Sequence, residues 1–411
     1  MTKKNRTPVE TLQQFSLPLI AGVFVAVVWA NLGYNSYHSF IHWAPIGYGF
    51  NFHFLINDIF MVFFFGIAAK EITESFLPGG ALSPMSKAVN PLLATLGGVV
   101  GPICVYFAYV HFSGDASIKN GWGIPTATDI AIAWLVARII FGAKHPAVSF
   151  LLLLAIADDA IGLVIIAIFY PDPAHPVQPL LLLIVLGAVL LAWGLRKITI
   201  ADNDSRYLPF LMCGFISWIG LYYAGLHPAL ALVPIVPFMP GPKLDEGLFA
   251  EHGHKHTDTL NRFGDAFRLP VDIGLFAFGL ANAGVVFSTI GNATWAVLLA
   301  LVIGKTVGIT LFSLIAEKVF HSSLPTGMNK RDLIVAGMIA SIGLTVALFV
   351  AGVAFTDASM TGAAKMGALF SAGMAPVAIL AGLLIRKRKE KKDESTVLQV
   401  PNYLGGNYTI N

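Results

Sequence analysis

The chain has 411 residues, of which 56% are hydrophobic and 12% are charged, and its formal net charge is +3. Soluble domains carry about 25% charged residues, so this composition excludes an ordinary soluble protein and predicts a membrane protein with many spans. The small net charge gives no indication of nucleic-acid binding, and the two cysteines have neither disulfide nor metal-site spacing.

Twelve membrane spans are predicted from the apolar runs. The apolar stretch that follows the charged start is too long for a signal peptide, so we expect it to be the first span. Two spans are unusual, because the fourth contains Pro125 and the eighth is very short. The predicted spans are about 16–34, 57–78, 89–111, 123–142, 147–170, 178–196, 206–223, 226–239, 269–288, 293–316, 332–355 and 364–386.

Lys and Arg are distributed unevenly among the predicted loops. With the N-terminus placed inside, the outer segments hold little beyond Lys119 and Lys365. The positive-inside rule therefore predicts that both termini are cytoplasmic and that the number of spans is even. The inner set is Lys3, Lys4, Arg6, Lys87, Lys144, Arg196, Lys197, Arg206, Lys243, Lys255, Arg262, Lys318, Lys330, Arg331 and the tail from Arg386 to Lys392.

The loops and ends complete the predicted organisation. The first outer loop, 34–57, contains a turn at 45–51 that could form a short hairpin at the membrane interface. We expect residues 1–15 to be a cytoplasmic N-terminus, 16–386 a single transmembrane unit, and 387–411 a basic, disordered cytoplasmic tail. The polar loop from Pro240 to Arg268 holds His252, His254 and His256, which are expected either to be solvated or to have incidental affinity for a metal ion.

Four ionisable residues lie within the predicted spans: Asp129, Asp158, Asp159 and Lys305. A charge at the bilayer centre costs roughly 2.5–3.5 kcal/mol on insertion scales, so such residues predict a functional site by default. Adjacent carboxylates repel each other and are expected to titrate as a coupled unit. Carboxylates that hold either protons or a small hard cation could perform antiport. The alternative is structural, because Lys305 and one aspartate could form a buried ion pair.

One span in each half of the chain is interrupted. Pro125 removes a backbone donor from the fourth span, where Thr126 and Thr128 can satisfy freed backbone groups, and Gly343 lies within the eleventh. This pattern is typical of inverted-repeat transporters with unwound backbone at the midplane. Asp129 and Lys305 could offset the partial charges of the half-helix ends left there.

Five segments resemble, in the same order, signature stretches of the NhaA family of sodium/proton antiporters. The resemblance extends from about residue 10 to 386. It implies an all-α polytopic membrane protein of twelve helices, with an inverted-topology repeat and two broken, crossing helices. It also implies a transport core at about 89–170 and 293–386 and an interface panel at about 16–78 and 178–288. The segments are Gly121–Ala131, Ala155–Gly162, Ala281–Gly284, Gly304–Ile309 and Ser341–Thr345.

The resemblance implies a secondary active antiporter of the bacterial inner membrane. Such a protein exports sodium or lithium in exchange for protons by alternating access, is electrogenic and pH-regulated, forms a homodimer in the lipid bilayer, and needs no cofactor. The family's pH-response histidines are not matched here, since the aligned positions hold Asn261, Arg262 and Asp265.

The resemblance also implies roles for individual residues. Asp159 is the main carboxylate for both cation and proton, and Asp158 beside it is paired with Lys305 until a cation binds, so sodium is expected at Asp159 and Asp158. The further polar positions implied are Asp129 and Thr128 at the helix crossing, with Thr345, Asp58 and Glu71 as secondary sites.

Two other classes of protein are alternatives to a transporter. An intramembrane aspartyl protease needs its aspartates in Tyr-Asp and Gly-x-Gly-Asp contexts, whereas Asp159 follows Ala-Asp and Asp129 follows Ala-Thr. We therefore do not expect an enzyme. A channel or a non-transporting relative is the remaining alternative, and currents far above carrier turnover would favour the channel.

Overall fold

The computed structural model describes residues 17–44, 50–80, 83, 85–171, 177–201, 206–242 and 258–397, which form helices joined by turns and loops. Six of the described helices are long and apolar enough to cross a membrane, or eight if each of two bent pairs counts as one span, and two shorter apolar helices accompany them. The prediction of an all-α membrane protein is therefore confirmed.

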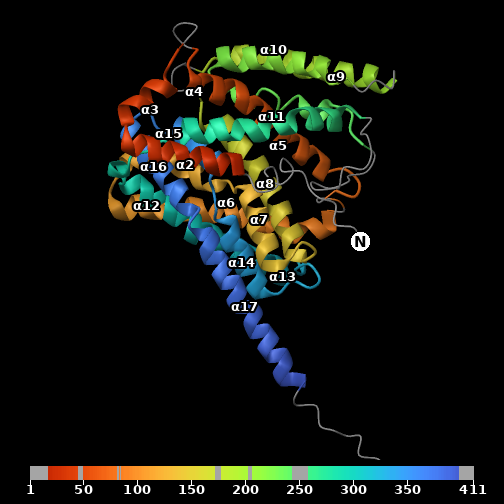
Figure 1. Ribbon diagram of the computed structural model, residues 1–411. Coiled ribbons are helices and arrows are strands. Elements are labelled where there is room, and N and C mark those ends of the chain that lie inside the picture. Colours follow the sequence, from red (N-terminus) through yellow and green to blue (C-terminus); the bar gives the residue numbers. More distant parts are fainter. Residues whose placement is uncertain are drawn as a thin grey trace, which may run out of the picture.

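The helices pack side by side in a bundle from which the C-terminal helix extends (Figure 1). Helix α2 packs along α11, α9 along α10, and α6 along α13. Elements η1 and η7 are π-helical and the other η elements are 3₁₀ helices. In chain order the elements are α2 (Leu17–Leu32), α3 (Tyr34–Ile41), α4 (Phe52–Phe54), η1 (Leu55–Phe60), α5 (Met61–Ser75), α6 (Met85–Ser113), η2 (Ala116–Thr126), α7 (Ile130–Phe141), α8 (Pro146–Phe169), η3 (Pro179–Leu181), α9 (Leu182–Ala201), α10 (Leu208–Ala224), η4 (Pro228–Leu230), η5 (Val236–Phe238), α11 (Thr259–Asn282), η6 (Phe287–Thr289), α12 (Asn292–Leu299), η7 (Ala300–Lys305), α13 (Thr306–Val319), α14 (Lys330–Ala340), α15 (Thr345–Ala354), α16 (Ala358–Ser371) and α17 (Met374–Val397).

The segment predicted as the eighth helix, 226–239, is not an α-helix. It forms the short 3₁₀ turns η4 and η5, because Pro228, Pro234 and Pro237 cannot donate the backbone bonds that a continuous helix needs. The segment is largely buried and contacts α5 and α10. Irregular backbone at membrane depth is tolerated where protein surrounds it, so this segment can lie inside the bundle.

Three further boundaries differ from the prediction. Residues 34–41 of the first outer loop form helix α3, while the turn residues 45–49 lie outside the described part of the chain. Helix α11 begins at Thr259, earlier than the predicted start at residue 269. The backbone of α17 is helical to Val397, beyond the predicted end of the last span at residue 386. His252, His254 and His256, the N-terminal lysines and residues 398–411 also lie outside the described residues.

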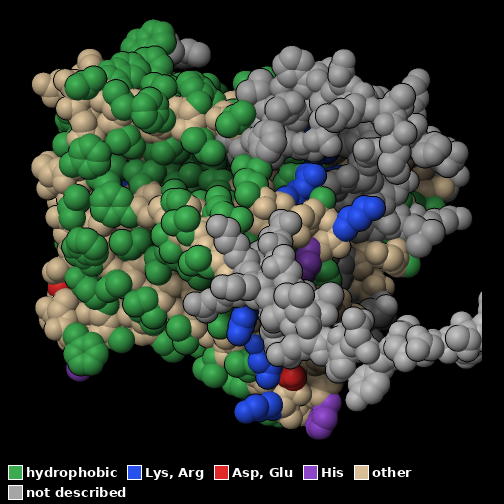
Figure 2. Space-filling model, turned by 60° about the horizontal axis from the view of Figure 1, so that its bottom comes forward, with side chains coloured by type: hydrophobic (Ala, Val, Ile, Leu, Met, Phe, Trp, Pro, Cys, Tyr) green, Lys and Arg blue, Asp and Glu red, His purple; other side chains and the backbone are tan. Residues whose placement is uncertain are grey.

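Hydrophobic side chains cover a broad part of the surface, and Lys and Arg gather in a limited region of the face seen in Figure 2. The exposed apolar side chains include many from α9 and α10, such as Leu183, Leu190 and Met212. A soluble protein rarely exposes so large an apolar area, so this surface fits a lipid environment.

Helices α6 and α13 approach closely because glycines face each other. A Cβ atom on Gly308 would lie 2.0 Å from the carbonyl oxygen of Gly97, and one on Gly97 would lie 2.2 Å from the carbonyl oxygen of Gly308. Small residues of this kind let transmembrane helices pack backbone to backbone. The contact fixes α13 and the adjoining π-helical turn η7, which carries Lys305, against α6.

We expect Gly308→Ala to lower the stability of the protein by about 1–3 kcal/mol or more, because the added methyl group would overlap backbone atoms. Gly187→Ala in α9 is the matched control, since no atom lies within 4 Å of a Cβ at that position. Thermal denaturation of both variants in detergent measures the difference. Equal melting curves for the two variants would contradict the close-packing account.

Candidate functional site

Two bent helix pairs meet at the centre of the molecule. Helices η2 and α7 are bent by 58° at their break, and α14 and α15 are bent by 48°. The two breaks touch, because the backbone N–H of Asp129 donates to the carbonyl oxygen of Ile342 at 2.9 Å. Gly343 is required there, since a Cβ atom would lie 2.9 Å from the carbonyl oxygen of Ala127.

The Asp129 carboxylate binds the N-terminal ends of α7 and α15, the second helix of each bent pair. Its carboxylate accepts from the backbone N–H of Ile132 at 3.1 Å in α7 and from the hydroxyl of Thr345 at 2.5 Å in α15. The backbone N–H of Thr345 lies 3.4 Å from the same carboxylate. An anion at a helix N-terminus is stabilised by the helix dipole. Asp129 therefore neutralises two half-helix ends where the broken spans cross.

Replacing Thr345 by Val should weaken this crossing, because Asp129 then loses a charge-assisted hydrogen bond worth about 1.5–3 kcal/mol. We expect a lower melting temperature and slower transport. Thr310→Val is the matched control, since the Thr310 hydroxyl only donates back to the Thr306 carbonyl oxygen within its own helix. A Thr345→Val protein that melts like the control would show that the bond does not stabilise the crossing.

Asp158 and Lys305 form a buried ion pair. The Lys305 ammonium contacts Asp158 Oδ2, and both side chains are 0% exposed. The Thr128 hydroxyl lies 2.7 Å from the same carboxylate oxygen and accepts from Lys305 at 2.6 Å. It also lies 2.9 Å from the carbonyl oxygen of Ala340, at the end of α14. One oxygen of Asp158 is thus fully engaged by residues from the broken span and from η7.

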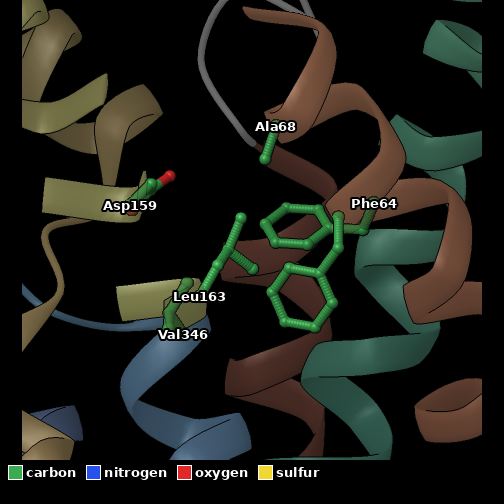
Figure 3. A pocket seen from close by; sticks show the side chains of 6 residues that line it. Phe64, Ala68, Asp159, Leu163 and Val346 are labelled. Carbon is green, nitrogen blue, oxygen red and sulfur yellow. The ribbon is translucent and has the colours of Figure 1, made fainter. Parts of the chain in front are cut away.

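Asp159 faces a different direction from Asp158. Successive residues of a helix are rotated by about 100°, so adjacent side chains on α8 point to different neighbours. Asp159 lines a small cavity between α8, α5 and α15, together with Phe64, Phe65, Ala68, Leu163 and Val346. Figure 3 shows its carboxylate pointing into the space between these helices. The cavity offers about 10 Å³, close to the minimum space for one water molecule.

Each of the two carboxylates keeps one buried oxygen without a hydrogen-bond partner, namely Asp158 Oδ1 and Asp159 Oδ1. Buried polar atoms are normally satisfied, so unpaired carboxylate oxygens on neighbouring residues indicate a place for a proton or a cation. The described residues hold no group of three or more His, Cys, Asp or Glu that could bind a metal ion. Any cation here would therefore depend on two carboxylates and neutral oxygens.

Glu71 and Asp58 are the two remaining secondary positions, since Thr345 already lies at the crossing beside Asp129. Glu71 lies 3.6 Å from Lys70, which also binds Glu74 at 2.5 Å, near the end of α5. Asp58 is in η1, and its carbonyl oxygen accepts from the indole N–H of Trp218. The contacts named here thus join Glu71 and Asp58 to other residues, whereas the structure brings together Asp158, Lys305 and Thr128. The apolar residues that line the cavity gave no signal in the sequence, because they resemble every other residue of an apolar span.

Comparison with known proteins places this architecture in a family. The family model described as Na⁺/H⁺ antiporter 1 matches residues 8–384. The chain is 54% identical over 386 residues to the Na⁺/H⁺ antiporter NhaA of Geobacter metallireducens, covering 93% of this chain and 99% of that one. It is also 54% identical over 397 residues to the Na⁺/H⁺ antiporter NhaA of Desulfitobacterium hafniense, covering 96% of this chain and 100% of that one.

A solved structure has a similar fold. The sodium proton antiporter MjNhaP1 from Methanocaldococcus jannaschii aligns with a TM-score of 0.55 at 14% sequence identity, covering 90% of this chain and 91% of that one. At that identity the likeness concerns the fold alone.

Proposed function

Because the chain belongs to the Na⁺/H⁺ antiporter 1 family and is a sodium/proton antiporter, we propose that Asp159 is the carboxylate on which sodium and protons compete. The observation that carries the proposal is the asymmetry of the aspartate pair. Asp158 is held through Oδ2 by Lys305 and Thr128, whereas the Asp159 carboxylate forms no hydrogen bond or salt bridge among the described residues and lines a cavity. Asp159 can take a proton or a cation without breaking any contact, whereas the carboxylate of Asp158 is shared with Lys305 and Thr128.

Lys305 gives the site a second response to cation binding. A cation that reaches Asp159 would also attract Asp158, whose Oδ1 has no partner, and would compete with the Lys305 ammonium for that carboxylate. Binding of one cation then favours the release of one proton from Asp159 and one from Lys305. This arrangement supports electrogenic exchange, because the two protons carry more charge than the one cation that displaces them.

The proposed architecture is a twelve-span inverted repeat with both termini in the cytoplasm of a bacterial inner membrane. In it the buried segment 226–239 is the eighth crossing, α6–α8 and α12–α17 form a core, and α2, α4–α5 and α9–α11 form a panel. The two bent pairs, one in each half of the core, support the repeat. The Lys and Arg distribution among the loops supports the orientation. A homodimer in the lipid bilayer completes the proposal.

The cation preference and the response to pH are also proposals. Sodium and lithium are hard cations that prefer oxygen ligands, and the site presents carboxylate, hydroxyl and carbonyl oxygens. Regulation by pH in this chain would have to use groups other than matched family histidines, since Asn261, Arg262 and Asp265 occupy those positions.

A dequenching assay in everted vesicles tests the function. A proton gradient is formed, alkali cations are added at several pH values, and collapse of the gradient reports exchange. We expect sodium and lithium to collapse the gradient in a pH-dependent manner. No response to any alkali cation at any pH would overturn the proposed function.

A further inference from the structure

Lys365 is a second buried cation that the exchange chemistry does not use. The Lys and Arg distribution counts it among the outer residues, at the start of the predicted span 364–386, but Lys365 is only 8% exposed within α16. It forms no salt bridge among the described residues, and its one hydrogen bond there joins Nζ to Asn282 Oδ1 at 3.5 Å. Burying a lysine ammonium without an ion-pair partner costs free energy, so its position indicates a structural or functional role.

The contact of Lys365 joins two parts of the molecule. Asn282 lies at the end of α11, and its amide donates to Asn57 Oδ1 at 2.8 Å in η1. Asn57 in turn lies 2.8 Å from Nε2 of His53 in α4. These three residues belong to the proposed panel, and Lys365 belongs to the proposed core. The chain of side chains therefore crosses the boundary at which core and panel must separate in alternating access.

The Lys365–Asn282 contact lies beyond the Asp159 cavity in the direction of the end of α15. Val346 lines the cavity, and the ring of Phe349 in the next turn packs edge-on against Phe65 with centroids 5.3 Å apart. Gly352 in the turn after that lies beside Lys365, since a Cβ there would be 3.9 Å from Lys365 Nζ. The rise from Val346 to Gly352 is about 9 Å. The Phe349 ring beside Phe65, and then the Lys365 side chain, thus lie between the cavity and the end of α15.

We propose that Lys365 and Asn282 form a clasp that holds the outer side of the antiporter closed in this conformation. This inference rests on the proposed function, because the end of α15 faces outward only if both termini are cytoplasmic. A cation that leaves outward must part Phe349 from Phe65 and then pass the Lys365 ammonium, which repels it. Outward opening therefore requires α16 to release Asn282. Lys365 acts as a positioning residue for the closed state.

Accessibility of the cavity from outside tests the clasp without measuring transport. Cys104 and Cys213 are replaced by Ser, and Leu163→Cys in the cavity is the reporter. Its labelling by a membrane-impermeant methanethiosulfonate is followed in right-side-out vesicles. We expect Lys365→Met to speed labelling about tenfold, the size expected for loss of a hydrogen bond to a charged group. Lys330→Met is the control, because Lys330 is exposed and pairs only loosely with Glu317 at 3.5 Å.

Asn282→Ala removes the other half of the clasp and should speed labelling to a similar extent. The double variant Lys365→Met/Asn282→Ala should label no faster than Asn282→Ala alone, because the Lys365–Asn282 contact is already lost in that single variant. Labelling as slow as in the Lys330→Met control, in both single variants, would overturn the clasp. Faster labelling only from the cytoplasmic side, in everted vesicles, would overturn it as well. Neither outcome depends on transport, so a failure of the Asp159 assignment would be seen separately.

Discussion

Replacing Asp159 by Asn is expected to reduce sodium-dependent proton movement in proteoliposomes to the level of protein-free vesicles. Asparagine has nearly the same shape as aspartate but cannot bind or release a proton at physiological pH, and its amide cannot supply a negative charge to a cation. Because Asp159 has no hydrogen-bond partner at Oδ1, the substitution breaks no contact of that atom within the protein. The loss should therefore be a loss of exchange and not a loss of folding.

Asp357→Asn is the matched control for this substitution. Asp357 is an exposed N-cap residue of α16 whose carboxylate accepts from the backbone N–H of Met360, and asparagine is an equally good N-cap. The control should transport normally, and all three proteins should elute as the same species in size-exclusion chromatography. Retained exchange in a well-folded Asp159→Asn protein would contradict the site assignment.

Lys305→Met is expected to destabilise the protein strongly. The substitution leaves the Asp158 carboxylate buried without its ammonium partner, which typically costs about 3–5 kcal/mol. The double variant Lys305→Met/Asp158→Asn should recover much of this loss, because no unpaired charge remains. Thermal denaturation of the two variants beside Lys330→Met, which breaks only an exposed pair, measures the difference.

The same variants test whether the two aspartates have different roles. Asp158→Asn and the double variant are expected to retain altered exchange, since Asp159 and its cavity are intact. Complete and equal loss of exchange on replacing Asp158, Asp159 or Lys305 would contradict this division. A double variant no more stable than Lys305→Met would contradict the ion-pair account of stability.

The chemistry of the site is largely predictable from the sequence, for a physical reason. Charged groups are costly within apolar spans, so Asp129, Asp158, Asp159 and Lys305 stand out from the apolar residues around them. Their partners are harder to predict. The rotation of α8 that directs Asp158 to Lys305 and Asp159 to the cavity depends on packing against α5 and α6, and an apolar run carries no record of which side faces which neighbour.

Parts of the fold could not be predicted from hydropathy. The segment 226–239 is apolar enough to be counted as a span, but its prolines make it a series of turns enclosed by α5 and α10. Lys365 is placed near an end of its span by sequence alone, whereas the structure buries it against Asn282. Both differences arise from contacts between segments far apart in the sequence, which windowed hydropathy does not contain.

Proton release on sodium binding tests most directly whether Asp159 is where the two ions compete. Purified protein in weakly buffered detergent solution with a pH indicator is mixed with sodium chloride, and choline chloride serves as the ionic-strength control. We expect sodium to release protons from the parent protein and to release fewer or none from Asp159→Asn. Equal sodium-dependent release from both proteins would mean that the exchanged protons are held elsewhere and would contradict the account.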